Sequence, residues 1–93
     1  MPKFIIEREV PDAGKMTEDQ KRLAARESNA VRDELGASNL QWIESYFSDD
    51  KIYCIYIAED EDVLLEHARC LDIPASRISR VRAVTDPTTA ESR

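Results

Sequence analysis

The feature that most constrains the fold of this chain is a pair of apolar segments, Leu40–Phe47 and Lys51–Ala58, separated by only three polar residues. Both segments are rich in β-branched and aromatic side chains, and both are as long as a typical strand. Two such segments joined by a short polar turn predict an antiparallel β-hairpin.

The register of this hairpin decides which side chains share a face. A two-residue turn at Asp49-Asp50 pairs Tyr46 with Tyr53 and Glu44 with Ile55. One face then carries Trp42, Glu44, Tyr46, Tyr53, Ile55 and Ile57, and the other carries Ile43, Ser45, Phe47, Ile52, Cys54 and Tyr56. Both faces are mostly apolar, whereas a sheet with one wet face alternates. Helices in so short a chain cover one face, so we expect a second copy of the chain to cover the other.

The remaining segments predict an α+β fold. Lys3–Val10 alternates like a strand, Glu18–Leu35 has the pattern of a helix, and Glu59–Asp62 opens a second helix. Pro74 stops that helix, residues 75–79 are expected to form a short turn, and Val81–Thr85 is expected to be the last strand. The order β-α-β-β-α-β is that of the ferredoxin-like fold, with a four-stranded antiparallel sheet.

Each predicted helix has a start signal and an apolar stripe. Thr17 and Gln20 fit a capping box before the first helix. The stripe of that helix is made of small residues, which predicts a close approach to the sheet; it comprises Ala24, Ser28, Val31 and Leu35. The stripe of the second helix comprises Leu64, His67, Ala68 and Leu71.

Length and composition set further limits. The 93 residues predict a single domain over residues 1–86, followed by a flexible tail at 87–93. A net charge of −6 argues against a nucleic-acid partner. No apolar run reaches the roughly 18 residues of a membrane span, and the N-terminus lacks a signal-peptide pattern, so we expect a cytoplasmic protein that binds no membrane. Cys54 and Cys70 are then expected to be free thiols.

His67 is the only histidine, and its pattern allows two interpretations. Imidazole titrates near neutral pH and ligates nickel and zinc, so His67 is a candidate metal ligand or acid–base group. It also lies on the apolar stripe of a helix. There it is a candidate core residue whose ring nitrogens bond to backbone or tyrosine hydroxyl groups.

Glu7 and Glu44 fall on strand faces otherwise occupied by apolar side chains. A carboxylate in such a place needs a partner, because burying it alone costs much free energy. The candidate partners are a metal ion, an arginine such as Arg82, and water at an edge strand.

Aromatic side chains of the hairpin are candidates for the wall of a ligand pocket between two sheets. Trp42, Tyr46, Tyr53 and Tyr56 belong to this group, and Cys54 lies between Tyr53 and Ile55 in the same strand. The alternative is packing for the aromatic residues and an inert buried thiol for Cys54. The sequence contains no Gly-rich phosphate loop, Ser/His/Asp arrangement or CxxC pair.

A set of short motifs runs from Met1 to about Ala90: KFIIER (Lys3–Arg8), QWIESY (Gln41–Tyr46), DKIYCIY (Asp50–Tyr56), Glu66-His67-Ala68, and Ile73–Arg77 followed by Asp86-Pro87. Together they resemble a small nickel-binding ferredoxin-like family, long classed as a domain of unknown function, that includes an actinobacterial nickel-binding protein. The resemblance implies a dimeric α/β barrel formed through the open sheet faces. It also implies binding of nickel or another divalent transition metal, with Glu7, Glu44 and His67 as the ligands by position.

Three functions remain as hypotheses. The first is a non-enzymatic homodimer that binds nickel for storage, buffering or sensing. The second is a dimeric-barrel enzyme, similar to monooxygenases or isomerases, that acts on a small organic substrate. The third is an interaction module without a small-molecule site.

Overall fold

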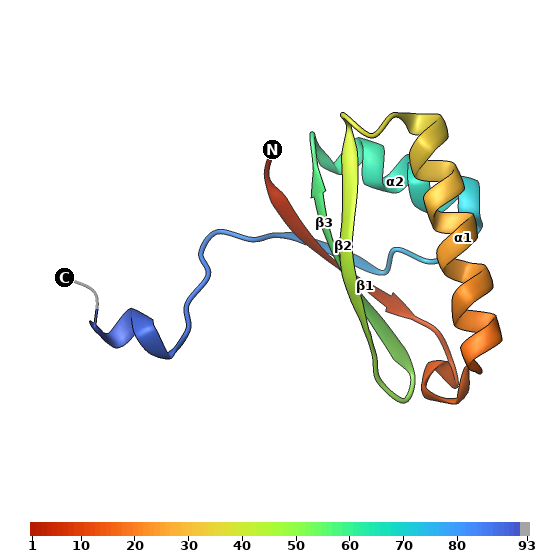
Figure 1. The fold of residues 1–93 in the computed structure, drawn as a ribbon, viewed down its shortest axis with the longest axis horizontal. Helices are drawn as coiled ribbons and strands as arrows, with labels where there is room; N and C mark the ends of the chain where they lie inside the picture. Colours follow the sequence, from red (N-terminus) through yellow and green to blue (C-terminus); the bar gives the residue numbers. More distant parts are fainter. Residues whose placement is uncertain (92–93) are drawn as a thin grey trace.

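The computed structural model describes residues 1–91 and confirms the ferredoxin-like α+β fold. The described strands form one antiparallel sheet in the order β2-β3-β1-β4. Both helices cover the same face of this sheet, and the opposite face is open (Figure 1). The elements are β1 (Lys3–Glu9), α1 (Glu18–Leu35), β2 (Leu40–Phe47), β3 (Lys51–Ala58), α2 (Glu61–Leu71) and β4 (Arg77–Arg80), with short 3-10 helices at Ala13–Lys15 and Pro87–Glu91.

The starts of both helices are fixed by side chains that satisfy free backbone groups. The predicted capping box is present: Thr17 Oγ1 accepts from the Gln20 amide at 3.1 Å, and Gln20 Oε1 accepts from the Thr17 amide at 2.8 Å. Asp60 caps α2 by accepting from the Val63 amide at 3.0 Å. Gly36, with φ of 98°, ends α1 in a conformation that a side chain would strain.

The core lies between the sheet and α2. It consists of Phe4, Ile6, Leu40, Cys54, Tyr56, Ala58 and Leu64. The predicted stripe of α2 is confirmed, because Leu64, His67 and Ala68 are buried and Leu71 is half-buried.

The predicted close approach of α1 is wrong. No residue of α1 is buried, and a cavity of about 490 Å³ lies between this helix and the sheet. Of the predicted stripe of α1, Ser28, Val31 and Leu35 are half-buried, whereas Ala24 is exposed.

The predicted last strand is also wrong, because β4 occupies Arg77–Arg80 instead of Val81–Thr85. Ile78 lies opposite Ile6 of β1, and the side chain of Ile78 packs against the core. The Val81 amide still donates to the Lys3 carbonyl at 2.8 Å, and the chain then leaves the sheet. Pairing with β1, which is a long-range contact, therefore fixes the position of this strand.

The predicted hairpin register is confirmed over most of its length, since Tyr46 pairs with Tyr53 and Glu44 with Ile55. A register shift between Trp42 and Glu44 leaves Ile43 without a partner, as in a β-bulge. Trp42 lies opposite Tyr56 and therefore faces the helices, whereas Ile43 lies on the open face. The bulge reverses the predicted faces of these two side chains, because one extra residue shifts the alternation by one.

The C-terminal segment leaves the sheet on the side of its open face (Figure 1). The predicted flexible tail at 87–93 stays a prediction; residues 87–91 form a 3-10 helix, and residues 92–93 lie outside the described part of the chain. Cys54 and Cys70 are free thiols, the first buried and the second exposed. Neither α1 nor α2 combines the length and apolarity needed to cross a membrane, and these are the long helices of residues 1–91.

Candidate functional site

His67 lies on the inner face of α2, where it joins this helix to α1 and the sheet. Its side chain is 0% exposed. The ring Nε2 lies 3.1 Å from the Ser28 carbonyl oxygen and 3.4 Å from the Ser28 hydroxyl, and the ring packs edge-on against Tyr56 at 5.6 Å. Because a carbonyl oxygen only accepts, Nε2 carries the proton and Nδ1 is the unprotonated nitrogen. His67 thus holds three elements together.

The surroundings of His67 favour its neutral form. Burial lowers the pKa of the imidazole below its usual value, and the positive charge of Arg8 lowers the pKa further, while the bond to Ser28 opposes both effects. Nδ1 has no hydrogen-bond partner within residues 1–91. A protonated ring would carry an unpaired N–H at Nδ1 in the core, so the interpretation of His67 as a core residue agrees with its geometry.

Glu7 and Glu44 lie on the open face of the sheet, on the side opposite the helices. Glu7 lies 3.9 Å from Lys51 Nζ and 3.9 Å from Arg77 Nε. Its arginine partner is therefore Arg77 of β4. Glu44 is exposed and accepts a hydrogen bond from the Tyr46 hydroxyl.

The sheet separates His67 from Glu7 and Glu44, so one chain does not bring the three candidate ligands together. The two carboxylates also lie apart on the open face. Strand β3 lies between them. Glu7 pairs with Tyr53 of β3, Tyr53 pairs with Tyr46 of β2, and Glu44 lies two residues from Tyr46 along β2. Two strand spacings and this shift place their Cα atoms about 12 Å apart. Within the described residues there is no group of three or more side chains that could hold a metal ion. The candidate ligands of a single chain therefore do not fit a nickel ion.

The predicted pocket residues are divided between the two faces as well. Tyr46 and Tyr53 lie on the open face, whereas Trp42 and Cys54 face the helices. Cys54 is a buried core thiol, in agreement with the inert alternative. Tyr56 also faces the helices, so a pocket formed between two sheets would include only Tyr46 and Tyr53 from this set.

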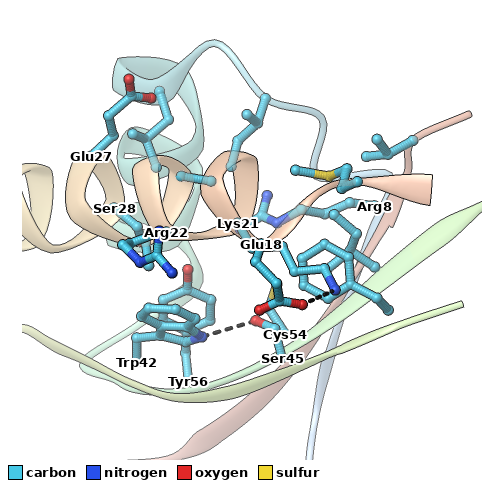
Figure 2. Close-up of a pocket in the computed structure, with 18 residues that line it drawn as sticks. Arg8, Glu18, Lys21, Arg22, Glu27, Ser28, Trp42, Ser45, Cys54 and Tyr56 are labelled. Carbon is cyan, nitrogen blue, oxygen red and sulfur yellow. Dashed lines mark hydrogen bonds and ion pairs between the residues drawn. The ribbon is translucent and has the colours of Figure 1, made fainter. Parts of the chain in front are cut away.

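A cavity lies instead between α1 and the helix-covered face of the sheet (Figure 2). Trp42 forms part of its wall, and the indole Nε1 donates to Ser45 Oγ at 2.9 Å. The Tyr56 hydroxyl points from the sheet toward α1 (Figure 2). Burial raises the pKa of this phenol, so the hydroxyl keeps its proton at neutral pH.

Arg8 is the residue of this cavity that the sequence reasoning missed. It is 3% exposed, and its guanidinium contacts the cavity from β1. The alternation in KFIIER carried the signal, because Arg8 follows Phe4 and Ile6 at the period of a strand and so falls on the buried face.

The fold and the two-faced sheet define a small α+β protein of the ferredoxin-like class. Its sequence matches the family described as "Nickel responsive protein SCO4226-like" over residues 4–81. The chain belongs to this family, and the resemblance stated above is confirmed. No curated protein matches the sequence.

A solved structure has the same fold. The crystal structure of SCO4226 from Streptomyces coelicolor A3(2) aligns with a TM-score of 0.75 and 16% sequence identity. The alignment covers 89% of this chain and 99% of that chain. At this identity the likeness concerns the fold and does not extend to side-chain chemistry.

Proposed function

We propose that this protein is a non-enzymatic nickel-responsive protein that binds the metal as a homodimer. Membership of the SCO4226-like family over residues 4–81 is the observation that carries the proposal. Storage, buffering and sensing are all compatible with it. A cytoplasmic location stays a prediction, to which the free thiols of Cys54 and Cys70 are suited.

The open face of the sheet supports the dimer in this proposal. Its centre is apolar, with Ile5, Ile55 and Ile57 from adjacent strands, and its rim carries charges such as Lys3 and Glu9. An apolar centre with a polar rim is the usual composition of a protein interface. Antiparallel packing of two such faces gives the dimeric α/β barrel.

The dimer also brings candidate metal ligands from two chains to one interface. Carboxylates from two copies can approach one another across the interface, although the Cα atoms of Glu7 and Glu44 in one chain lie about 12 Å apart. Glu44 is the better candidate ligand of the two, because Lys51 and Arg77 already balance the charge of Glu7. His67 has no part in this site, since its ring lies on the other side of the sheet.

Equilibrium dialysis of the full chain against micromolar nickel, followed by metal analysis, tests the proposal. We expect the protein to retain nickel, Glu44→Gln to weaken binding more than Glu7→Gln, and His67→Gln to leave binding unchanged. Glu34→Gln, on the exposed side of α1, is the matched control. Absence of retained nickel would refute the metal function. Loss of nickel in a folded His67→Gln variant would place the metal in the helix-covered core instead.

A further inference from the structure

The cavity between α1 and the sheet has the size and lining of a small-molecule site. Its volume of about 490 Å³ lies within the range of ligand pockets, about 300–1,000 Å³. Most of its wall is apolar and comes from the helix, the sheet and the segment after α2. These apolar residues include Met16, Ala25, Phe47, Ile52, Leu71 and Ile73.

Arg8, the buried charged side chain in this wall, lacks a counter-ion among residues 1–91. Arg8 Nη1 donates to the Pro74 carbonyl at 2.7 Å, but Nη2 is buried without any hydrogen-bond partner in residues 1–91. None of the ion pairs among the described residues includes Arg8. A buried guanidinium without an anion costs much free energy, so the cavity presents a positive charge that an anion would neutralise.

The neighbouring polar groups suit a carboxylate. The Tyr56 hydroxyl and the Ser28 hydroxyl belong to the same cavity as Arg8, and both can donate hydrogen bonds. Guanidinium and carboxylate form strong, charge-assisted hydrogen bonds. The other charged side chains of the wall come from α1, where Lys21 and Arg22 are paired with Glu18 and Asp19 and Glu27 is exposed. The buried charge of Arg8 beside a mostly apolar surface favours a ligand with one anionic end and an apolar body.

We infer that this cavity binds a small amphipathic carboxylic acid, with its carboxylate at Arg8 and its aliphatic or aromatic body between α1 and the sheet. This site lies on the face of the sheet opposite to Glu7 and Glu44. It is therefore independent of the proposed metal site and of the open-face dimer.

The chain contains its own reporter for the test, because Trp42 is the only tryptophan and lies in the cavity wall. Trp42 fluorescence is recorded while the metal-free protein, kept in a chelator, is titrated with octanoate, octanamide or acetate. We expect a saturable change with octanoate, at least tenfold weaker binding of octanamide, which lacks the charge, and no saturable binding of acetate, which lacks the apolar body. Equal binding of octanoate and octanamide, or no saturable response to octanoate, would overturn the inference.

Substitution of Arg8 tests the position of the carboxylate. Arg8→Met should weaken octanoate at least tenfold and leave octanamide unchanged, whereas Arg26→Met, at an exposed position of α1, should change neither. Arg8→Lys keeps the charge and is expected to retain part of the preference for octanoate; circular dichroism confirms that each variant is folded. Unchanged octanoate binding by folded Arg8→Met would refute the assignment. Should neither Arg8 variant fold, the comparison of octanoate with octanamide in the natural chain decides.

Discussion

The ring Nε2 of His67 lies 3.1 Å from the carbonyl oxygen of Ser28, which ties α2 to α1. The only histidine of the chain is thus committed to helix packing on one side of the sheet, while the carboxylates of Glu7 and Glu44 lie on the other.

This geometry predicts that His67 makes stability depend on pH. Burial lowers the pKa of the folded imidazole below the value of 6.5 expected for the unfolded chain. The unfolded state therefore takes up the proton first, and the free energy of unfolding should decrease as the pH falls below about 6.5. In His67→Gln this part of the pH dependence should be absent. Urea unfolding of the natural chain and of His67→Gln between about pH 7.5 and 5.5 measures this difference. Since both proteins contain the same carboxylates, an equal decrease of the free energy of unfolding in the two would contradict the prediction.

The bulge at Ile43 puts Trp42 on the same face as Ser45, whose hydroxyl accepts from the indole, so replacing Ser45 should lower the stability. Ser45→Ala leaves the half-buried indole N–H of Trp42 without its acceptor, so we expect a cost of about 1 kcal/mol in the free energy of unfolding. Ser79→Ala, at a half-buried position of β4, is the matched control and should change stability by less than about 0.5 kcal/mol. Chemical unfolding followed by circular dichroism compares them at one protein concentration. Equal effects of the two substitutions would show that the Trp42–Ser45 bond adds nothing.

The open-face dimer predicts that a charge at Ile43 yields monomers. Ile43 and Leu65 are each 49% exposed in the single chain, but Ile43 lies on the open face and Leu65 on α2. Ile43→Lys should halve the mass measured by size-exclusion chromatography with light scattering, because an unpaired charge in an apolar interface is costly. Leu65→Lys should keep the mass of the natural chain. A natural chain that is already monomeric would refute the dimer.

The capping box predicts a measurable effect at the start of α1. This helix buries no side chain completely, so its end contacts matter more than they would in a well-packed helix. Thr17→Ala removes the acceptor for the Gln20 amide and should cost about 1 kcal/mol, which corresponds to roughly 4–8 °C in Tm for a domain of this size. Thr17→Ser keeps a hydroxyl cap and should lose much less. Indistinguishable melting curves for Thr17→Ala and Thr17→Ser would contradict this role.

Much of the hairpin and both helices could be predicted because the responsible signals are local. The turn at Asp49-Asp50 sets the pairing of Tyr46 with Tyr53, and Thr17 with Gln20 marks the start of α1. β4 could not be placed in this way. The segment at 81–85 has the stronger β-branched pattern, but Ile78 pairs opposite Ile6, and that choice depends on contacts far apart in the sequence.

For the candidate site, too, local signals predicted some features and long-range packing decided the others. The sequence identified Glu7, Glu44 and His67 as unusual residues, and alternation gives the strand face of each glutamate, but it contains no local signal for which face of the sheet the helices cover. The bulge places Trp42 on the helix-covered face, and the gap between α1 and the sheet leaves a cavity beside Arg8. Both features result from packing between elements, which a periodic pattern does not encode.

By itself, the sequence determined the order of elements, the capping box of α1, the hairpin register from Glu44 to the turn and the two apolar faces, because caps, turns and periodicity act between residues close in the chain. Only the tertiary structure decided that His67 bonds to Ser28, that the candidate ligands lie on opposite faces, and that Nη2 of Arg8 has no hydrogen-bond partner within residues 1–91. Those outcomes depend on which side chains meet after the sheet and helices have packed.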